Sequence, residues 1–161
     1  STRKLTISAM VVALYIVLIY LTQGISFGAY QIRIATSLYA LAYAFPFLIA
    51  PMGIGNLISN FLFGGLGILD MVGGFGVGIL TTGIIVLMRR VGLSAWWTML
   101  PIILVPALCV PLWLSPLVGV PYWALVINLL IGQTIPGIVG ATLVKALASR
   151  RTVAALMNAI K

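Results

Sequence analysis

Apolar residues fill most of the chain in long runs, and short clusters of glycine, proline and polar residues separate these runs. A transmembrane helix needs roughly 20 residues, and about 17 suffice. Divided at the polar clusters, the chain predicts six membrane spans. Their approximate bounds are Leu5–Leu21, Ser37–Ala50, Met52–Phe63, Met71–Met88, Ala95–Leu114 and Tyr122–Leu147. The pattern therefore predicts an all-α integral membrane protein, with a single six-helix domain over residues 1–161 that includes a short basic tail over residues 149–161.

Prolines modify several of the predicted spans. Pro46 lies inside the second span and predicts a kink there, while Pro51 is expected to start the third span. The second span is also short, so we expect it to be tilted, broken or shielded by its neighbours. The fifth span carries Pro101, Pro106 and Pro111. We therefore expect this helix to be bent or locally unwound.

Composition supports the membrane class and excludes others. Mean hydropathy is +1.25 and 6 % of residues are charged, so a soluble fold of this size would expose too much apolar surface. The formal net charge of +8 arises at the ends of apolar runs, which is typical of topology signals, so we expect no nucleic-acid partner. The single cysteine, Cys109, and the absence of histidine predict no metal site and no cofactor. Without a Walker A sequence or an acid pair, we expect no catalysis.

The basic residues also predict an orientation. With six spans both termini lie on the same side, and placing them in the cytoplasm puts eight of the nine basic residues there. The eight are Arg3, Lys4, Arg89, Arg90, Lys145, Arg150, Arg151 and Lys161. Only Arg33 then lies outside. We therefore expect a multi-pass protein of the plasma membrane with cytoplasmic termini.

Polar residues that could bind a ligand gather on the predicted outer side. They are Gln31, Arg33, Asn60, Asp70, Asn128 and Gln133, together with Tyr122 and Trp123 at the mouth of the last span. Amides between membrane helices more often join helices than bind ligands. Three amides in the outer halves of the spans nevertheless favour a binding site. Tyr122 and Trp123 fit an interfacial aromatic belt and could also cover a flat ligand. We therefore predict a binding site open to the exterior.

The two charged residues on this side have competing interpretations. Arg33 is either an ordinary surface arginine or a pocket residue and partner of Asp70. Asp70 is the only acid in the chain, and an acid near hydrocarbon is costly. It stands just before Met71, where a carboxylate would cap the fourth helix. An ion pair and a contact with ligand are the other two roles. We expect chiefly a cap that shapes the site.

Small residues form two further patterns. The run Gly73–Gly78 superficially resembles a dinucleotide-binding loop, but no strand precedes it and no acid follows it. Gly74, Gly78 and Thr82 instead predict a helix face that permits close approach of another helix. In the first span, Ala9 and Ala13 give a small-xxx-small pattern near the predicted cytoplasmic end.

A more specific pattern extends over residues 31–82. Gln31-Ile32-Arg33-Ile34 is similar to a Q-F-R-I segment, and the run from Gly64 through Asp70 to Thr82 is similar to a G-G-x-G…D…G…T-L pattern. Both belong to the QueT group of S-components, the substrate-binding subunits of energy-coupling-factor (ECF) vitamin transporters, which this chain resembles. The group usually continues R-I-S-E where this chain has Arg33-Ile34-Ala35-Thr36, and it carries a glutamate where this chain has Gln133.

The resemblance implies the substrate-capturing subunit of an ATP-driven micronutrient importer in a prokaryotic plasma membrane. It implies a queuosine precursor, a 7-deazapurine, as substrate. Its partners would be a membrane coupling subunit and two ATPase subunits, with Ala9 and Ala13 on the face that meets the coupling subunit. The two missing acids leave open a related neutral or anionic nutrient, recognised partly by Arg33.

Other function classes also stay open. Another vitamin-specific S-component would share the architecture. A small membrane scaffold would use its polar residues only to join helices and would bind no small molecule tightly. A channel or facilitator would need a continuous polar stripe, which the inner halves of the spans lack.

Overall fold

The long apolar runs form long helices, as the hydropathy pattern predicts. The computed structural model describes residues 2–27, 32–148, 155 and 158, and these residues contain helices and no strands. The long helices are α1 (Thr2–Leu21), α4 (Ile68–Arg90), α5 (Met99–Val118) and α6 (Tyr122–Ala148). The shorter elements are α2 (Gln23–Ser26), η1 (Ile34–Tyr43), η2 (Pro46–Leu48), α3 (Ile49–Ser59), η3 (Asn60–Gly64) and η4 (Ala95–Thr98).

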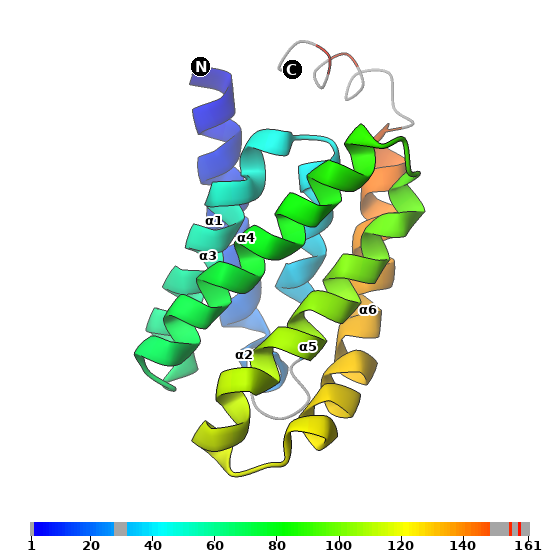
Figure 1. Ribbon diagram of the computed structural model, residues 1–161. Helices are drawn as coiled ribbons and strands as arrows, with labels where there is room; N and C mark the ends of the chain where they lie inside the picture. The colour runs from blue at the N-terminus through cyan, green and yellow to red at the C-terminus, as the bar shows by residue number, and fades with distance from the viewer. Residues whose placement is uncertain (1, 28–31, 149–154, 156–157, 159–161) are drawn as a thin grey trace.

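Five segments of the described chain are long and apolar enough to cross a membrane. They are Thr2–Leu21, Pro46–Gly64, Ile68–Arg90, Ala95–Val118 and Tyr122–Ala148, and a shorter apolar helix covers Ile34–Tyr43. When the shorter helix is included, successive segments run in alternating directions. The start of α1 and the end of α6 therefore lie at the same end of the bundle (Figure 1). The prediction of an all-α membrane protein is confirmed.

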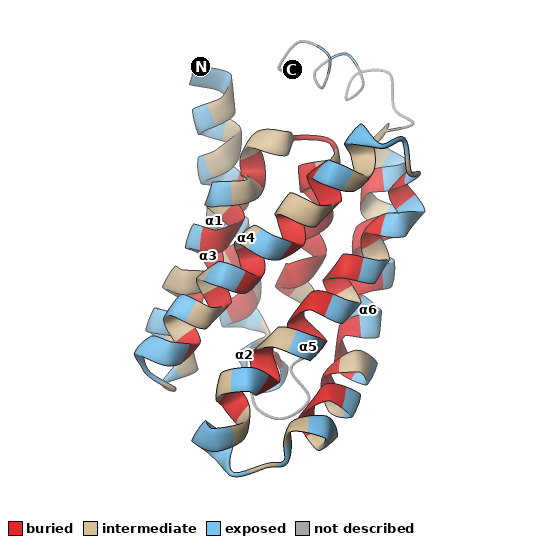
Figure 2. Ribbon diagram, in the orientation of Figure 1, coloured by how far each residue is buried: buried red, intermediate tan, exposed pale blue. Residues whose placement is uncertain are grey.

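The second predicted span, Ser37–Ala50, is wrong in its bounds, while its expected break and its shielding by neighbouring helices are confirmed. The structure has η1 instead, a 3₁₀ helix of ten residues, which at about 2.0 Å per residue reaches about 20 Å. The hydrocarbon core of a bilayer is about 30 Å thick. Every residue from Ala35 to Ala42 is buried, because α1, α4 and α6 pack around η1 (Figure 2). Neighbouring helices, rather than lipid, therefore cover this segment.

Pro46 begins a helix and does not kink one. η1 ends at Tyr43, and Pro46 is the first residue of η2, which leads directly into α3. The missing N–H of proline removes no hydrogen bond in a first turn, where that group has no partner in the helix. Pro51 consequently lies inside the third span and does not start it.

The fourth and fifth helices also differ from expectation. α4 begins at Ile68, three residues before the predicted Met71. α5 stays α-helical through Pro106, Pro111 and Pro116, so the expected local unwinding is wrong and the expected bend stays a prediction. Each proline removes one hydrogen bond within the helix, and the packing of α5 against α4 and α6 keeps the helix intact.

Close packing of α3 against α4 confirms the predicted face of small residues. A Cβ atom at Gly78 would lie 2.9 Å from the Cα atom of Gly53 on α3. Such a distance tolerates only glycine. The close approach brings the later part of α3, which carries Asn56, against the first half of α4, and this contact helps to form the site described below.

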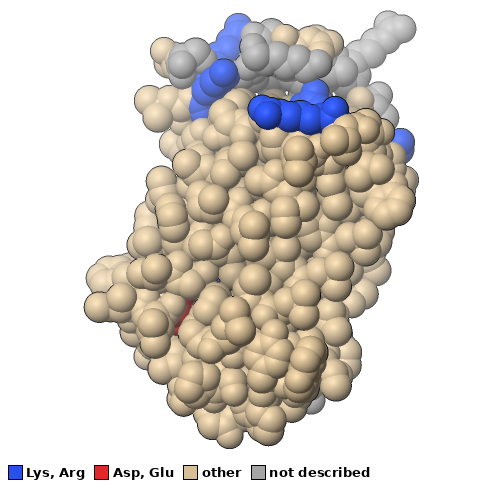
Figure 3. Space-filling view, in the orientation of Figure 1, with Lys and Arg blue, Asp and Glu red and all other residues tan. Residues whose placement is uncertain are grey.

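The two ends of the bundle differ in charge. The first turn of α1 carries Arg3 and Lys4, and the last turns of α4 and α6 carry Arg89, Arg90 and Lys145. These turns lie at one end (Figure 1), where the blue side chains gather in Figure 3. The remaining predicted cytoplasmic cations, Arg150, Arg151 and Lys161, lie outside the described residues. Arg33 lies toward the other end, just before η1.

Candidate functional site

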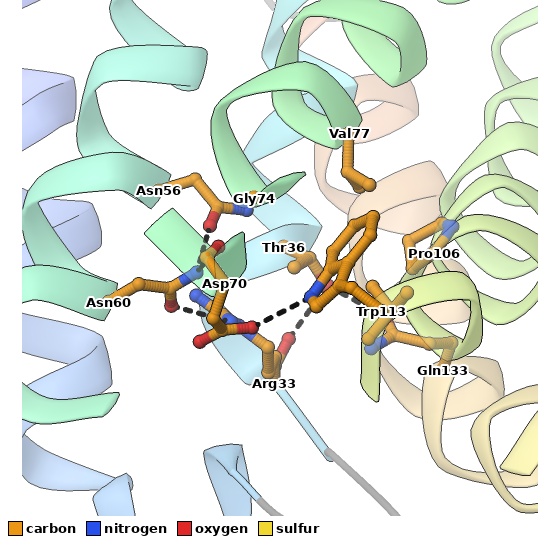
Figure 4. Close-up of a pocket in the computed structure, with 11 residues that line it drawn as sticks. Arg33, Thr36, Asn56, Asn60, Asp70, Gly74, Val77, Pro106, Trp113 and Gln133 are labelled. Carbon is orange, nitrogen blue, oxygen red and sulfur yellow. Dashed lines mark hydrogen bonds between the residues drawn. The ribbon is translucent and has the colours of Figure 1, made fainter. Parts of the chain in front are cut away.

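A small cavity lies in the half of the bundle away from the basic end. Side chains from η1, α3, η3, α4, α5 and α6 converge on it (Figure 4). Its lining consists of Arg33, Thr36, Asn56, Asn60, Asp70, Gly74, Val77, Pro106, Val110, Trp113 and Gln133. Among the described residues, the site thus combines the chain's only acid with a buried arginine and three buried amides.

Arg33 is a buried member of this site, with 5 % of its surface exposed. Its Nη1 atom donates to Asn60 Oδ1 at 3.0 Å and its Nη2 atom to the Tyr15 hydroxyl at 3.0 Å. The guanidinium also lies 5.3 Å from the centre of the Phe27 ring, within cation–π range. Its Nε–H is buried without a hydrogen-bond partner. Buried donors are nearly always paired, so this N–H is available to a ligand or water.

The arginine keeps its positive charge in this environment. Desolvation by burial lowers the pKa of Arg33, but two neighbouring tyrosines and Asp70 raise it, and the net pKa lies above the ordinary arginine value. The guanidinium therefore stays charged at any physiological pH.

A chain of amides and tyrosines holds Arg33 in place. Asn60 Nδ2 donates to Asn56 Oδ1 at 3.1 Å and to the Asp70 main-chain oxygen at 2.9 Å. Asn56 Nδ2 donates to the Tyr39 hydroxyl at 2.6 Å, and this hydroxyl lies 3.3 Å from that of Tyr15. The network joins α1, η1, α3, η3 and α4, and so fixes the polar wall of the cavity.

This wall depends on the absence of a side chain at Gly74. A Cβ atom there would collide with the side-chain amides of both Asn56 and Asn60. On the opposite wall, Thr36 Oγ1 lies 2.7 Å from the Arg33 main-chain oxygen and 3.0 Å from Gln133 Oε1. Gln133 is fully buried, and this contact ties α6 to η1.

Asp70 does not cap α4, so the expected cap is wrong. The helix begins at Ile68 after Gly67, which adopts φ +90, and no side chain caps it. Asp70 lies in the first turn, where its charge still favours the helix dipole. Its Oδ1 atom accepts a hydrogen bond from Trp113 Nε1 on α5 at 3.1 Å. The acid is 4 % exposed and shows as a narrow red patch in a recess of Figure 3.

The site therefore holds two opposite charges that do not form an ion pair. Arg33 and Asp70 line the same cavity, yet within the described chain no ion pair of 4.0 Å or less joins them. The cavity itself offers about 10 Å³ to the centre of a water-sized sphere. That volume holds about one water molecule. The cavity is therefore closed to anything much larger than a water molecule.

The cavity brings together half of the residues predicted from the sequence. Arg33, Asn60, Asp70 and Gln133 line it. Asn128 is half-buried on α6 and Trp123 is 68 % exposed, and neither is part of the lining. The Tyr122 hydroxyl donates to the Leu108 main-chain oxygen at 2.8 Å. Gln31 lies outside the described residues.

Sequence reasoning missed several residues of the site. Asn56 lies one helical turn before Asn60, and this four-residue spacing is a signal that could have identified it. Trp113 lies near the end of the fifth predicted span, a position typical of an aromatic belt, and only the tertiary structure shows that it contacts Asp70. Tyr15 and Tyr39 are fully buried in apolar segments that predict nothing beyond packing.

Comparison with known proteins identifies one family. A family model described as QueT transporter matches residues 5–149, which is most of the chain. No curated protein and no solved structure matches.

Proposed function

From the premise that the chain belongs to the QueT transporter family, we propose that it captures a queuosine precursor, a 7-deazapurine, for an ATP-driven ECF importer. Family membership and the five span-length helices make it a multi-pass transporter protein of a prokaryotic plasma membrane. The captured molecule enters from the side of the Arg33–Asp70 cavity, which is the outer side if the basic end faces the cytoplasm.

One observation carries this proposal: two buried, opposite charges line one cavity without pairing. A buried charge is costly unless a partner neutralises it. A ligand that accepts a hydrogen bond from Arg33 Nε and donates one to Asp70 would supply both partners. The lactam edge of a 7-deazaguanine ring carries a carbonyl acceptor beside N–H donors, which suits this arrangement.

Neutral amides complete the proposed site. Asn60 already donates both N–H hydrogens to Asn56 and Asp70, so it can offer a heterocycle only its acceptor oxygen. Gln133 carries an amide that can donate and accept, and neither residue adds charge. Gln133 stands where the family usually has a glutamate, and the neutral side chain favours a ligand edge without a positive charge. Asn128, Tyr122 and Trp123 have no place in this proposed site, because none of them lines the cavity.

Energy coupling needs a partner, and α1 offers the surface for it. Ala9 and Ala13 are exposed and line a shallow apolar groove between α1 and α3. The groove is otherwise lined by Leu5, Ser8, Val12, Ile16, Pro51 and Ile54. We propose that the coupling subunit packs here, because small residues let helix backbones approach closely, and that two ATPase subunits act through it.

Binding to the purified chain tests the proposed substrate. Calorimetry should detect binding of 7-deazaguanine, and methylation of its lactam N–H should weaken binding at least tenfold, because Asp70 then loses its donor. If neither 7-deazaguanine nor a panel of vitamins binds, the chain is a scaffold and the proposal is wrong.

Uptake by the assembled transporter tests the partner surface separately. Ala9→Leu and Ala13→Leu should abolish uptake and leave ligand affinity unchanged, whereas Met10→Phe on another side of α1 should affect neither. Loss of binding by the purified Ala9→Leu chain would refute this division of roles.

A further inference from the structure

We propose that the Trp113 ring occupies, in the closed structure, the space that the ring of the ligand occupies when bound. The ligand would displace Trp113 and lie beside Asp70. The space beside Asp70 and Gly73 that the Trp113 ring fills is called the indole site below. This inference rests on the proposed function, because it assigns a ligand to the same cavity. It adds a specificity rule: the indole site accepts a planar heteroaromatic ring with an N–H donor.

The indole site is shaped for a flat ring. A Cβ atom at Gly73 would lie 2.6 Å from both Cε2 and Cζ2 of Trp113, so the ring packs directly against the backbone of α4. Gly76, on the same helix, has no atom within 4 Å of its corresponding position. The absence of a side chain at Gly73 therefore leaves the space that the Trp113 ring occupies.

The polar end of the indole site matches a ring N–H. Trp113 Nε1 donates to Asp70 Oδ1 at 3.1 Å (Figure 4). One face of the indole site is therefore the surface of α4 at Gly73, and one edge is a buried carboxylate. An indole is a planar bicyclic ring with one N–H donor. A 7-deazapurine is also a planar bicyclic ring with N–H donors, so the two can satisfy the same groups in turn.

Trp113 is the one aromatic side chain of the lining, and a single hydrogen bond holds it there. The opposite wall is held by the linked hydrogen bonds of Arg33, Asn56 and Asn60. Trp113 has a single polar atom, which makes one bond, and its side chain is only half-buried. Because the closed cavity holds about one water molecule, entry of a ring requires this side chain to move.

Trp113→Phe tests the exchange, because phenylalanine keeps a ring but cannot hydrogen-bond to Asp70. The closed form then loses the bond that competes with the ligand, and calorimetry should show 7-deazaguanine binding roughly tenfold more tightly. Trp123→Phe, which alters an exposed tryptophan, should leave the affinity unchanged. Equal or weaker binding by Trp113→Phe would overturn the inference and leave the proposed function standing.

A second variant moves Trp113 without removing it. Gly73→Ala places a methyl group where the ring lies, whereas Gly76→Ala meets open space. In a chain whose other tryptophans are replaced by phenylalanine, Gly73→Ala should shift Trp113 emission to longer wavelength, and Gly76→Ala should not. Unchanged emission in Gly73→Ala would contradict the described indole site. This readout also applies if Trp113→Phe folds poorly.

If 7-deazaguanine does not bind the natural chain, the proposed substrate is wrong. A third experiment then tests the inference about Trp113 without that substrate. Trp113→Ala empties the indole site, so this variant should bind free indole at least tenfold more tightly than 1-methylindole, which lacks the N–H. The natural chain and Trp123→Ala should bind neither. Equal or absent binding of the two indoles by Trp113→Ala would overturn the inference.

Discussion

Arg33 and Arg89 lie toward opposite ends of the bundle, and each packs against an aromatic ring, but their partners differ. Arg89 Nη1 donates to the main-chain oxygens of Tyr43 and Ala44 at 2.7 and 3.2 Å. These carbonyls lie where η1 ends, just before Pro46. Because no helix continues there to supply N–H donors, the arginine supplies the hydrogen bonds that these carbonyls would otherwise lack. Arg89 therefore completes the fold at the basic end.

Arg33 has no such task. It donates to the side chains of Asn60 and Tyr15 and keeps one buried N–H without a partner. It also lines a cavity with Asp70, with which it forms no ion pair. Arg89 is bound to main-chain carbonyls and stabilises structure, whereas Arg33 is held by side chains and has a donor to spare, which supports the proposal that it meets a ligand. The comparison separates a structural end of the molecule from the end that we propose binds the ligand.

The largest expected effect comes from removing the charge at Arg33. Arg33→Gln leaves Asp70 as the only charge among the lining residues and removes the guanidinium that donates to Asn60 and Tyr15. Affinity for 7-deazaguanine should fall more than 100-fold in calorimetry, with a clear loss of thermal stability. Affinity within threefold of the natural chain would place Arg33 outside the ligand site and remove the contrast with Arg89.

A smaller effect is expected from the wall that holds Arg33. Gly74→Ala places a methyl group in the space that the Asn56 and Asn60 amides occupy. Overpacking of this kind lowers the free energy of unfolding by about 1–3 kcal/mol. We expect a lower midpoint of thermal unfolding and at least tenfold weaker binding. Gly76→Ala, on the exposed side of α4, is the matched control. Identical behaviour of the two variants would show that the amide wall does not determine affinity.

The smallest effect on binding is expected at the basic end. Arg89→Gln removes the donor to the Tyr43 and Ala44 carbonyls, so stability should fall by about 1–3 kcal/mol, measured as the free energy of unfolding. Ligand affinity should stay within twofold of the natural chain. A tenfold loss of affinity would mean that the two ends are coupled through η1 and that the contrast is too simple.

Hydropathy predicted the long helices because lipid-facing and buried residues are both apolar. The shortness of the second span indicated shielding by neighbours, but apolar composition could not predict that η1 is a 3₁₀ helix or where it ends. The start of the third helix was placed wrongly because a proline such as Pro46 is compatible with either a kink or a first turn.

The lining of the candidate site could be predicted only in part. Charge and amide groups are rare in an apolar chain, so Arg33, Asp70 and Gln133 were identified from composition alone. Trp113 was not, because a tryptophan near a span end is typical of the membrane interface. Its contact with Asp70 depends on how α4 and α5 pack, which no local pattern encodes.

Mass spectrometry of small molecules that co-purify with the chain tests the central claim most directly. The natural chain and Asp70→Asn are expressed in the same nutrient-rich prokaryotic host and purified in parallel. We predict a planar heterocycle with a carbonyl and N–H edge, near one molecule per chain, in the natural protein and its loss from Asp70→Asn. Equal amounts of the same compound in both preparations, or no compound in the natural protein, would contradict the account.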